Sequence, residues 1–324
     1  TLLVSTTGLN YANPVTLATG TSGTLTMGNT GTAISTTFSG GVTGTNNLTI
    51  NSNATSGTIT FSTANINNTG TVTHIGAGSG TTTVSSNIGS NVTTLTENSS
   101  TAALSITGTA TVSAITVTAG TLSVSNSVTV SGATSVTGTF TIASATGTKT
   151  FGNVTINNGG TWNNTAANED VSIGGNLQND GTLNAGTGVY TFTGTTKTIS
   201  GANTVTIPSV AVSGTYTNNG TLTIATALTG SGTLTQGTNS TLNIAASDAN
   251  FTITTLTASA SGNTVNYNGS GTQTIRAVNY YNLTGSSSSG TTAPAYVQNA
   301  KSANPDTNTA TSIAVAYSTQ NLTT

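Results

Sequence analysis

The chain has 324 residues, and only 3% of them are charged, with four Lys or Arg, six Asp or Glu and a net charge of −2. A nucleic-acid-binding protein needs clustered Lys and Arg to neutralise phosphates, so four scattered bases exclude that class. The same scarcity excludes a basic helix on a membrane surface, and no run of residues approaches the ~20 apolar positions of a membrane span.

The composition favours an ordered all-β chain over a disordered one. Thr, Val and Ile alternate repeatedly, which is the pattern of half-buried strands. Cysteine is absent, so the chain has neither disulfides nor a thiolate metal site. With so few ionisable groups, stability should depend weakly on pH, as suits extracellular material at a bacterial surface. Thr1 is an unusual translational start, and we expect a processed or truncated chain.

Residues 1–118 form an N-terminal region of irregular β-repeats. Its units share a Gly-Thr-apolar-Thr pattern, as at residues 23–26, 57–60 and 70–73. At the N-terminus, Leu2, Leu3 and Val4 are strand-like and carry no charged or Pro-rich cap. Because an uncapped strand edge invites pairing with another chain, we predict that these three residues take part in head-to-tail assembly.

Residues 119–284 repeat regularly. Equivalent positions at 120, 138, 160, 181, 201, 220, 241 and 262 are separated by 18 to 22 residues. Short strands with inward Leu, Ile or Val alternate with corners such as Asn158-Gly159, Asn219-Gly220 and Asn268-Gly269, where a positive φ is often needed. Stacked units of this kind bury a narrow, continuous core. We therefore predict an all-β fold, a β-solenoid with rungs of about 20 residues. The alternative is a row of tandem β-sandwich domains, whose strands have a similar spacing.

The composition changes near the C-terminus. Residues 285–292 are a predicted Ser/Gly-rich linker. Residues 293–324 are a predicted β segment, in which Ile313, Val315 and Tyr317 alternate as a strand. We expect this segment to be an incomplete sandwich domain or a donor strand that a partner chain receives by strand addition. Its three strand residues are therefore further assembly candidates.

No constellation of residues indicates an enzyme. The only adjacent acidic pair is Glu169-Asp170, and neighbours on a strand point to opposite faces. A glycosidase needs carboxylates ~5–10 Å apart, and the sole arginine, Arg276, lies far along the chain from this pair. His74 is the only histidine, so it has no partner for a zinc site, and we expect it at the surface or at a strand edge. We predict no catalytic residue and no cofactor.

Calcium is the metal that the sequence leaves open. Glu169, Asp170 and Asp180 are the candidate ligands, although Ca²⁺ usually needs several converging carboxylates. The nonapeptide Gly-Gly-x-Gly-x-Asp repeat is missing, and a turn role for Asp180 is the alternative. Lys149 and Glu169 are one period apart, so they are either an exposed pair on neighbouring rungs, stabilising by ~0–1 kcal/mol, or unrelated surface charges.

Several Thr-x-Thr units place one apolar residue between two threonines, so both Thr side chains should point outward. The units are Thr58-Ile59-Thr60, Thr191-Phe192-Thr193, Thr215-Tyr216-Thr217, Thr221-Leu222-Thr223 and Thr252-Ile253-Thr254. Stacked rungs would present Thr ladders, which could be strand formers, glycan acceptors, lateral contacts or an ice-binding surface. The spacing of the units drifts along the sequence, which argues against the regular array that ice binding needs.

Residues 214–244 resemble repeats of bacterial secreted surface proteins, namely autotransporter passenger domains and filamentous-haemagglutinin-like adhesins. The resemblance rests on Gly-Thr-Leu-type units at residues 220–224, 228–234 and 242–244, and it extends over residues 100–283. It implies secretion, a β-solenoid body, and a role in adhesion, sheath or filament formation.

We therefore expect an extracellular or cell-surface protein of a bacterium that forms a filament, sheath or surface layer through β-strand contacts. Its expected partners are further copies of itself and surface glycans, with neither nucleic acid nor membrane insertion. The alternatives are an adhesin stalk or a glycan-binding surface protein. An ice-binding protein and a polysaccharide-degrading solenoid are less favoured.

Overall fold

The computed structural model describes residues 1–20, 25–270, 273–287 and 313–317. It confirms the predicted fold class: the chain is all-β and forms a parallel β-solenoid with rungs of roughly 21 residues. The chain consists of two compact units, residues 1–169 (unit 1) and residues 170–324 (unit 2). The tandem-sandwich alternative is wrong, because the strands pair in parallel with the rungs above and below, whereas sandwich sheets are antiparallel.

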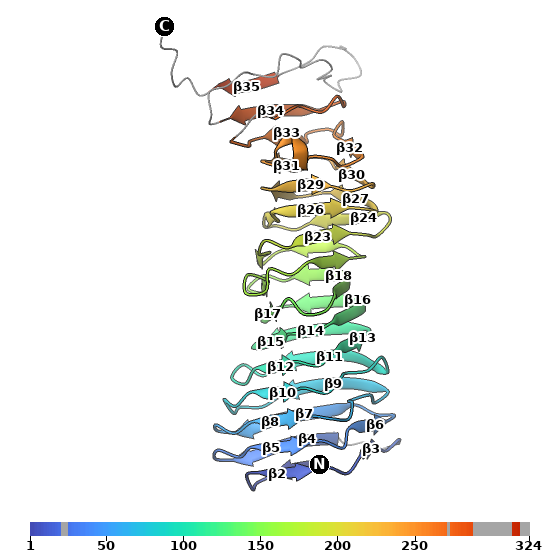
Figure 1. Ribbon diagram of the computed structural model, residues 1–324, viewed down its shortest axis with the longest axis vertical. Helices are drawn as coiled ribbons and strands as arrows, with labels where there is room; N and C mark the ends of the chain where they lie inside the picture. The colour runs from blue at the N-terminus through green and yellow to red at the C-terminus, as the bar shows by residue number, and fades with distance from the viewer. Residues whose placement is uncertain (21–24, 271–272, 288–312, 318–324) are drawn as a thin grey trace. The chain divides into compact units, whose positions relative to one another are not determined.

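Unit 1 has three faces, each a ladder of parallel strands, and Figure 1 shows the strands of successive rungs stacked in chain order. The first face contains β1 (Leu2–Val4), β4 (Leu25–Gly31), β7 (Leu48–Ala54), β9 (Gly70–Ile75), β11 (Val92–Asn98), β14 (Ala114–Ala119) and the C-terminal parts of β16 (Val128–Val136) and β18 (Lys149–Ile156).

The second face of unit 1 contains β2 (Leu9–Tyr11), β5 (Thr36–Phe38), β8 (Ile59–Phe61), β10 (Thr82–Val84), β12 (Leu104–Ile106), β15 (Thr121–Val124), β17 (Thr139–Ile142) and β19 (Thr161–Asn163). The third face contains β3 (Val15–Leu17), β6 (Val42–Gly44), single bridges at Ile66 and Ile88, β13 (Ala110–Val112) and the N-terminal parts of β16 and β18.

Unit 2 is built in the same way. One ladder contains β20 (Val171–Ile173), β23 (Val189–Phe192), β26 (Ser209–Val212) and β29 (Ala227–Thr229). A second contains β21 (Leu177–Asn179), β24 (Lys197–Ser200), β27 (Thr215–Asn218), β30 (Thr233–Gln236) and β32 (Thr255–Thr257). A third contains β25 (Val205–Thr206), β28 (Thr221–Ile224), β31 (Thr241–Ile244), β33 (Thr264–Tyr267), β34 (Asn282–Ser287) and β35 (Ile313–Tyr317). The remaining elements are β22 (Thr182–Asn184) and a 3₁₀ turn, η1 (Asp248–Asn250).

The strands follow from period-two alternation, which turns one set of side chains inward on each face. On the second face of unit 1, Leu104, Leu122, Phe140 and Trp162 are register partners on successive strands, and all four are buried. The Phe140 and Trp162 rings stack with centroids 4.7 Å apart. A core built as columns, one side chain per rung, is why a narrow interior can still be continuous.

Some corners need glycine for close backbone approach rather than for a positive φ. Of the three predicted Asn-Gly corners, only Gly159 has a positive φ, of 82°. A Cβ on Gly80 would lie 1.5 Å from the carbonyl oxygen of Gly57 on the rung below. Because no side chain fits at that distance, glycine is required where backbones of successive rungs touch.

Two of the predicted domain boundaries fall inside strands of the structure. Strand β14 spans residue 118, the predicted end of the irregular region, and β34 includes Gly285–Ser287, the start of the predicted linker. The strand predicted around Val315 is present as β35, which pairs in parallel with β34. Residues 288–312 lie outside the described part of the chain, so the incomplete sandwich domain or donor strand stays a prediction.

Candidate functional site

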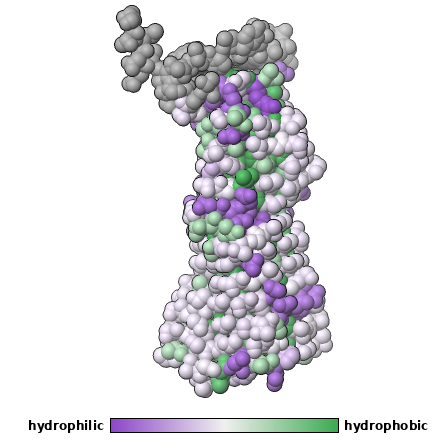
Figure 2. Space-filling model, in the orientation of Figure 1, coloured by the Kyte–Doolittle hydropathy of each residue, from purple (hydrophilic) through white to green (hydrophobic). Residues whose placement is uncertain are grey.

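Most of the charged residues of unit 1 are buried. Its only Lys, Asp, Glu or His residues are His74, Glu97, Lys149 and Glu169. The first three are buried, and Glu169 is half-buried. The outer surface of unit 1 is therefore mostly Thr, Ser, Asn and Gly, with Glu169 as its one partly exposed charged side chain. Over the elements of unit 1, Figure 2 is mostly near-white, because Thr, Ser and Gly lie in the middle of the hydropathy scale.

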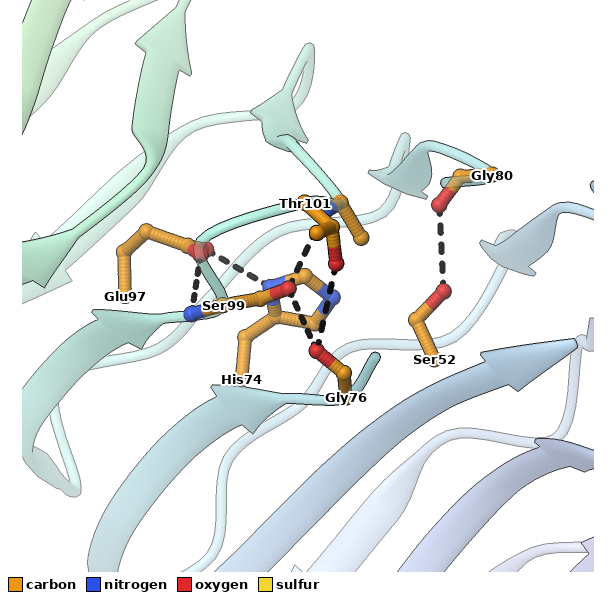
Figure 3. A network of polar contacts seen from close by, with 8 residues as sticks. Ser52, His74, Gly76, Gly80, Glu97, Ser99 and Thr101 are labelled. Carbon is orange, nitrogen blue, oxygen red and sulfur yellow. Dashed lines mark hydrogen bonds and ion pairs between the residues drawn. The ribbon is translucent and has the colours of Figure 1, made fainter. Parts of the chain in front are cut away.

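His74 and Glu97 form a buried pair inside unit 1, and the prediction of a surface histidine is wrong. His74 lies on β9 and Glu97 is its register partner on β11. Their side chains are both 0% exposed, and His74 Nδ1 lies 2.6 Å from Glu97 Oε2 (Figure 3). Along the ladder, Ile50 is the partner of His74 on the rung below, and Val117 is the partner of Glu97 on the rung above. The pair thus interrupts an aliphatic column.

Main-chain groups complete this network. The Ser99 backbone N–H donates to Glu97 Oε1 over 2.8 Å, and Ser99 Oγ donates to the carbonyl oxygen of Gly76 over 2.8 Å (Figure 3). Burial raises the pKa of Glu97, and the hydrogen bond and charge of His74 offset part of that rise. His74 Nε2 has no hydrogen-bond partner among the described residues. Both side chains are 0% exposed, so in this structure the pair has no contact with solvent.

Unit 2 has a neutral counterpart of this pair. Asn218 on β27 and Gln236 on β30 are register partners, and both are buried. Asn218 Nδ2 donates to Gln236 Oε1 over 2.8 Å and to the carbonyl oxygen of Thr241 over 2.9 Å. In the part of the chain that the structure describes, Gln236 Nε2 has no hydrogen-bond partner. Both units therefore place one polar pair on adjacent rungs of a core column.

Lys149 is buried, so both alternatives, an exposed pair with Glu169 and two unrelated surface charges, are wrong. Its Nζ donates to the carbonyl oxygens of Thr146 at 2.7 Å and Gly147 at 3.2 Å. Burial lowers the pKa of Lys149, and the charge of Glu169 raises it in part. The ammonium group therefore closes the turn between β17 and β18 through carbonyl groups.

The calcium candidates have local roles. Asp170 accepts a hydrogen bond from the Val189 backbone N–H, and Asp180 accepts hydrogen bonds from Ala202 N–H and Gln178 Nε2. The bond from Ala202, with that from Gln178, lowers the pKa of Asp180. Glu169 belongs to unit 1 and the two aspartates to unit 2. Within the described residues, no three His, Cys, Asp or Glu side chains gather at a possible metal site.

Arg276 belongs to a cluster in unit 2 that sequence reasoning missed. Its guanidinium lies 5.2 Å from the centroid of the Phe251 ring, and its Nη1 donates to the carbonyl oxygen of Ile253. The hydroxyls of Tyr267 and Tyr280 lie 2.8 Å apart beside it. Burial raises the pKa of both tyrosines. The three aromatic rings are buried, so the cluster closes the core and offers no open binding surface.

The first rung of unit 1 carries the assembly candidates of the N-terminus. Strand β1 pairs with β4 on one side, and no other described strand pairs with its outer edge. Val4 is buried, Leu2 is half-buried, and Leu3 is 40% exposed. Leu9 on β2 is 41% exposed, and these two leucines are the only exposed large hydrophobic residues among those described. Leu9 was not predicted, although the Leu9-Asn10-Tyr11 alternation could have revealed it.

The Thr-x-Thr units point as predicted. Their central residues, Ile59, Phe192, Tyr216, Leu222 and Ile253, are all buried, while the flanking threonines are half-buried or exposed. The spacing of the threonines varies along the sequence, but this variation does not shift the register of the strands. On the second face of unit 1 the strands stay in register from β5 to β17, because the extra residues fall in the corners.

No helix in the described part of the chain is long and apolar enough to cross a membrane. No protein-family model, curated protein or solved structure matches the chain.

Proposed function

We propose that this protein is a secreted structural subunit of a bacterial extracellular filament, sheath or surface layer, assembling through β-strand contacts. The observation that carries the proposal is the first rung of unit 1. It combines an outer strand edge without a partner in the described residues with the two exposed leucines, Leu3 and Leu9. An open strand edge beside apolar side chains is the usual template for strand addition.

The uncharged exterior of unit 1 supports the same function. Net charge and interspersed surface charges keep proteins monomeric, because like surfaces repel each other. Unit 1 has one half-buried carboxylate, Glu169, and no exposed Lys, Arg or Asp side chain. Copies of such a surface meet almost without electrostatic repulsion, as a structural material requires.

The test is assembly of the full chain, followed by sedimentation and negative-stain electron microscopy. We expect filaments or sheets from the wild-type chain, and dispersed particles from a Leu3→Asp/Leu9→Asp variant, because the added charges would be buried at the contact. Thr49→Asp is the matched control, since Thr49 points outward from β7, whose two edges are already paired with β4 and β9. Dispersed wild-type rods at every concentration would refute self-assembly and favour an adhesin stalk.

A further inference from the structure

The second face of unit 1 presents two outward columns of hydroxyl groups, which we call the hydroxyl face. In the central column, Thr37, Thr60, Thr83, Ser105, Ser123 and Thr141 are register partners on successive strands from β5 to β17. The flanking column lies two residues earlier in the chain, at Ser35, Thr58, Thr81, Ala103, Thr121 and Thr139. The first four directly precede their strands, and Thr121 and Thr139 are the first residues of β15 and β17. Only Ala103 lacks a hydroxyl. The result is a two-dimensional array rather than a single stripe.

Most of these hydroxyls are unused by the protein. None of the six central hydroxyls has a hydrogen-bond partner in the described part of the chain, and all six residues are half-buried. In the flanking column, Thr58 Oγ1 donates to Ser35 Oγ over 3.3 Å. Threonine is stiff at χ1 because its Cβ is branched, and packing against neighbouring rungs restricts it further. The Thr positions therefore hold their hydroxyls in restricted rotamers, whereas Ser35, Ser105 and Ser123 lack the branched Cβ. The hydroxyls of the central column are left to bond water.

The spacing of the array fits a tetrahedral water lattice. Strands of adjacent rungs are ~4.8 Å apart, and alternate residues of one strand are ~6.7 Å apart. Water molecules joined tetrahedrally by hydrogen bonds of about 2.75 Å place second-neighbour oxygens about 4.5 Å apart, and the lattice repeats at about 7.3 Å in the perpendicular direction. A mismatch of about 0.3 Å per rung reaches only about 1 Å over four rungs. Several rungs can therefore hold water in step with such a lattice.

Other ligand classes lack partners on this face. None of the two columns' residues is charged, so an ionic ligand finds no counter-charge. The aromatic rings of the same strands, Phe38, Phe61 and Phe140, are buried, so no ring is available to stack on a sugar. The first face provides a partial contrast. Its central column continues from Thr26, Thr49, Thr73, Thr96 and Thr116 to Ser135 and Thr155, but the positions two residues earlier are Asn47, Thr71, Thr94 and Ala114, so its second row has only two adjacent hydroxyls.

From these observations we propose that the hydroxyl face binds the ordered water of an ice surface. The ligand is crystalline water, the contacts are hydroxyl-to-water hydrogen bonds, and the Thr methyl groups pack between them. This inference does not rest on assembly at the first rung, because the hydroxyl face lies on the side of the unit, along β5 to β17, and not at its strand edge.

The test measures how much protein enters slowly growing ice, with the full chain and a non-binding globular protein as reference. We expect the wild-type chain to be enriched in the ice. A Thr60→Lys/Thr83→Lys variant should lose that enrichment by at least about tenfold, because the long charged side chains hold liquid-like water above the array. The matched control is Thr49→Lys/Thr73→Lys, which places the same change on the same two rungs but on the first face.

Circular dichroism checks that each variant is folded. If the Lys variant does not fold, Thr60→Val/Thr83→Val replaces it, because Val keeps the branched Cβ and removes only the hydroxyl. Three results would overturn the proposal: a wild-type chain excluded from ice, equal losses in the hydroxyl-face and first-face variants, or full uptake by a folded Val variant. Exclusion from ice with retention on crystalline cellulose would assign the face to a glycan instead and also overturn it.

Discussion

Unit 1 and unit 2 each place a polar pair in the core, His74–Glu97 in unit 1 and Asn218–Gln236 in unit 2. Each pair occupies adjacent rungs of a core column, each shares one side-chain hydrogen bond, and each leaves one nitrogen without a partner. One pair can ionise and the other cannot. The comparison shows that stacking in a core column sets the position of a polar pair. The charge of the two side chains sets how much free energy of unfolding is lost when one of them is removed.

The largest expected effect is loss of one member of the ionisable pair. Glu97→Ala leaves His74 buried without its partner, and we expect a loss of about 3–5 kcal/mol in the free energy of unfolding, as for a broken buried ion pair. Urea unfolding measures it. Thr96→Ala on the same strand is the control, since Thr96 points outward and is half-buried. Equal losses in the two variants would contradict a special role for the pair.

Replacing the whole pair should be far milder. A His74→Leu/Glu97→Val variant continues the aliphatic column formed by Ile50 and Val117. Replacing a buried ion pair with well-packed apolar residues is often neutral or stabilising. We therefore expect the double variant to recover most of the stability lost in Glu97→Ala. A double-mutant cycle in urea checks this, and simple additivity of the single losses would count against it.

A smaller effect is expected in the amide pair. Asn218→Ala removes the donor to Gln236 Oε1 and to the carbonyl oxygen of Thr241, and neutral buried groups left without partners cost about 1–3 kcal/mol. The measurement is the same urea unfolding. A loss as large as that of Glu97→Ala would show that charge is not what separates the two regions.

The two pairs should also differ in their response to pH. Burial raises the pKa of Glu97 in the folded state, so the folded chain holds this proton more tightly than the unfolded chain does. The associated stability is present below the ordinary pKa of a glutamate and is lost as the pH rises through the raised value, by about 1.4 kcal/mol for each unit of the rise. Glu97→Gln should remove this dependence, whereas Asn218→Ala should retain it. Unfolding midpoints measured from acid to neutral pH decide the point, and identical slopes for wild type and Glu97→Gln would count against it.

The smallest expected effect is that of calcium. Asp170 and Asp180 accept hydrogen bonds from two different main-chain N–H groups, those of Val189 and Ala202, so millimolar Ca²⁺ or a chelator should leave the melting temperature unchanged. A reproducible rise with Ca²⁺ that Asp180→Ser abolishes would restore the calcium site that the sequence suggested.

Sequence reasoning found the rungs, the inward columns and the outward threonines, because period-two alternation and a repeat near 21 residues are local properties. It misplaced His74 and Lys149. Lys is mostly exposed in proteins and His is intermediate. Neither burial is visible without the partner groups: Glu97 lies 23 residues from His74, and the carbonyl groups around Lys149 Nζ belong to its own turn. It also missed Leu9 and the aromatic surroundings of Arg276.

The sequence by itself determined a charge-poor, all-β chain of stacked short rungs. Composition, alternation and repeat length can all be read along the chain without knowing which rungs pair. What only the tertiary structure decided is register. Corners of unequal length made the Thr units look irregular along the chain, yet parallel pairing aligns Thr60, Thr83 and Ser105 on one face. The same alignment sets His74 against Glu97. Hydrogen bonds between the strands of successive rungs set the register, and so decide which residues are neighbours. Corners of different length are accommodated without changing that register.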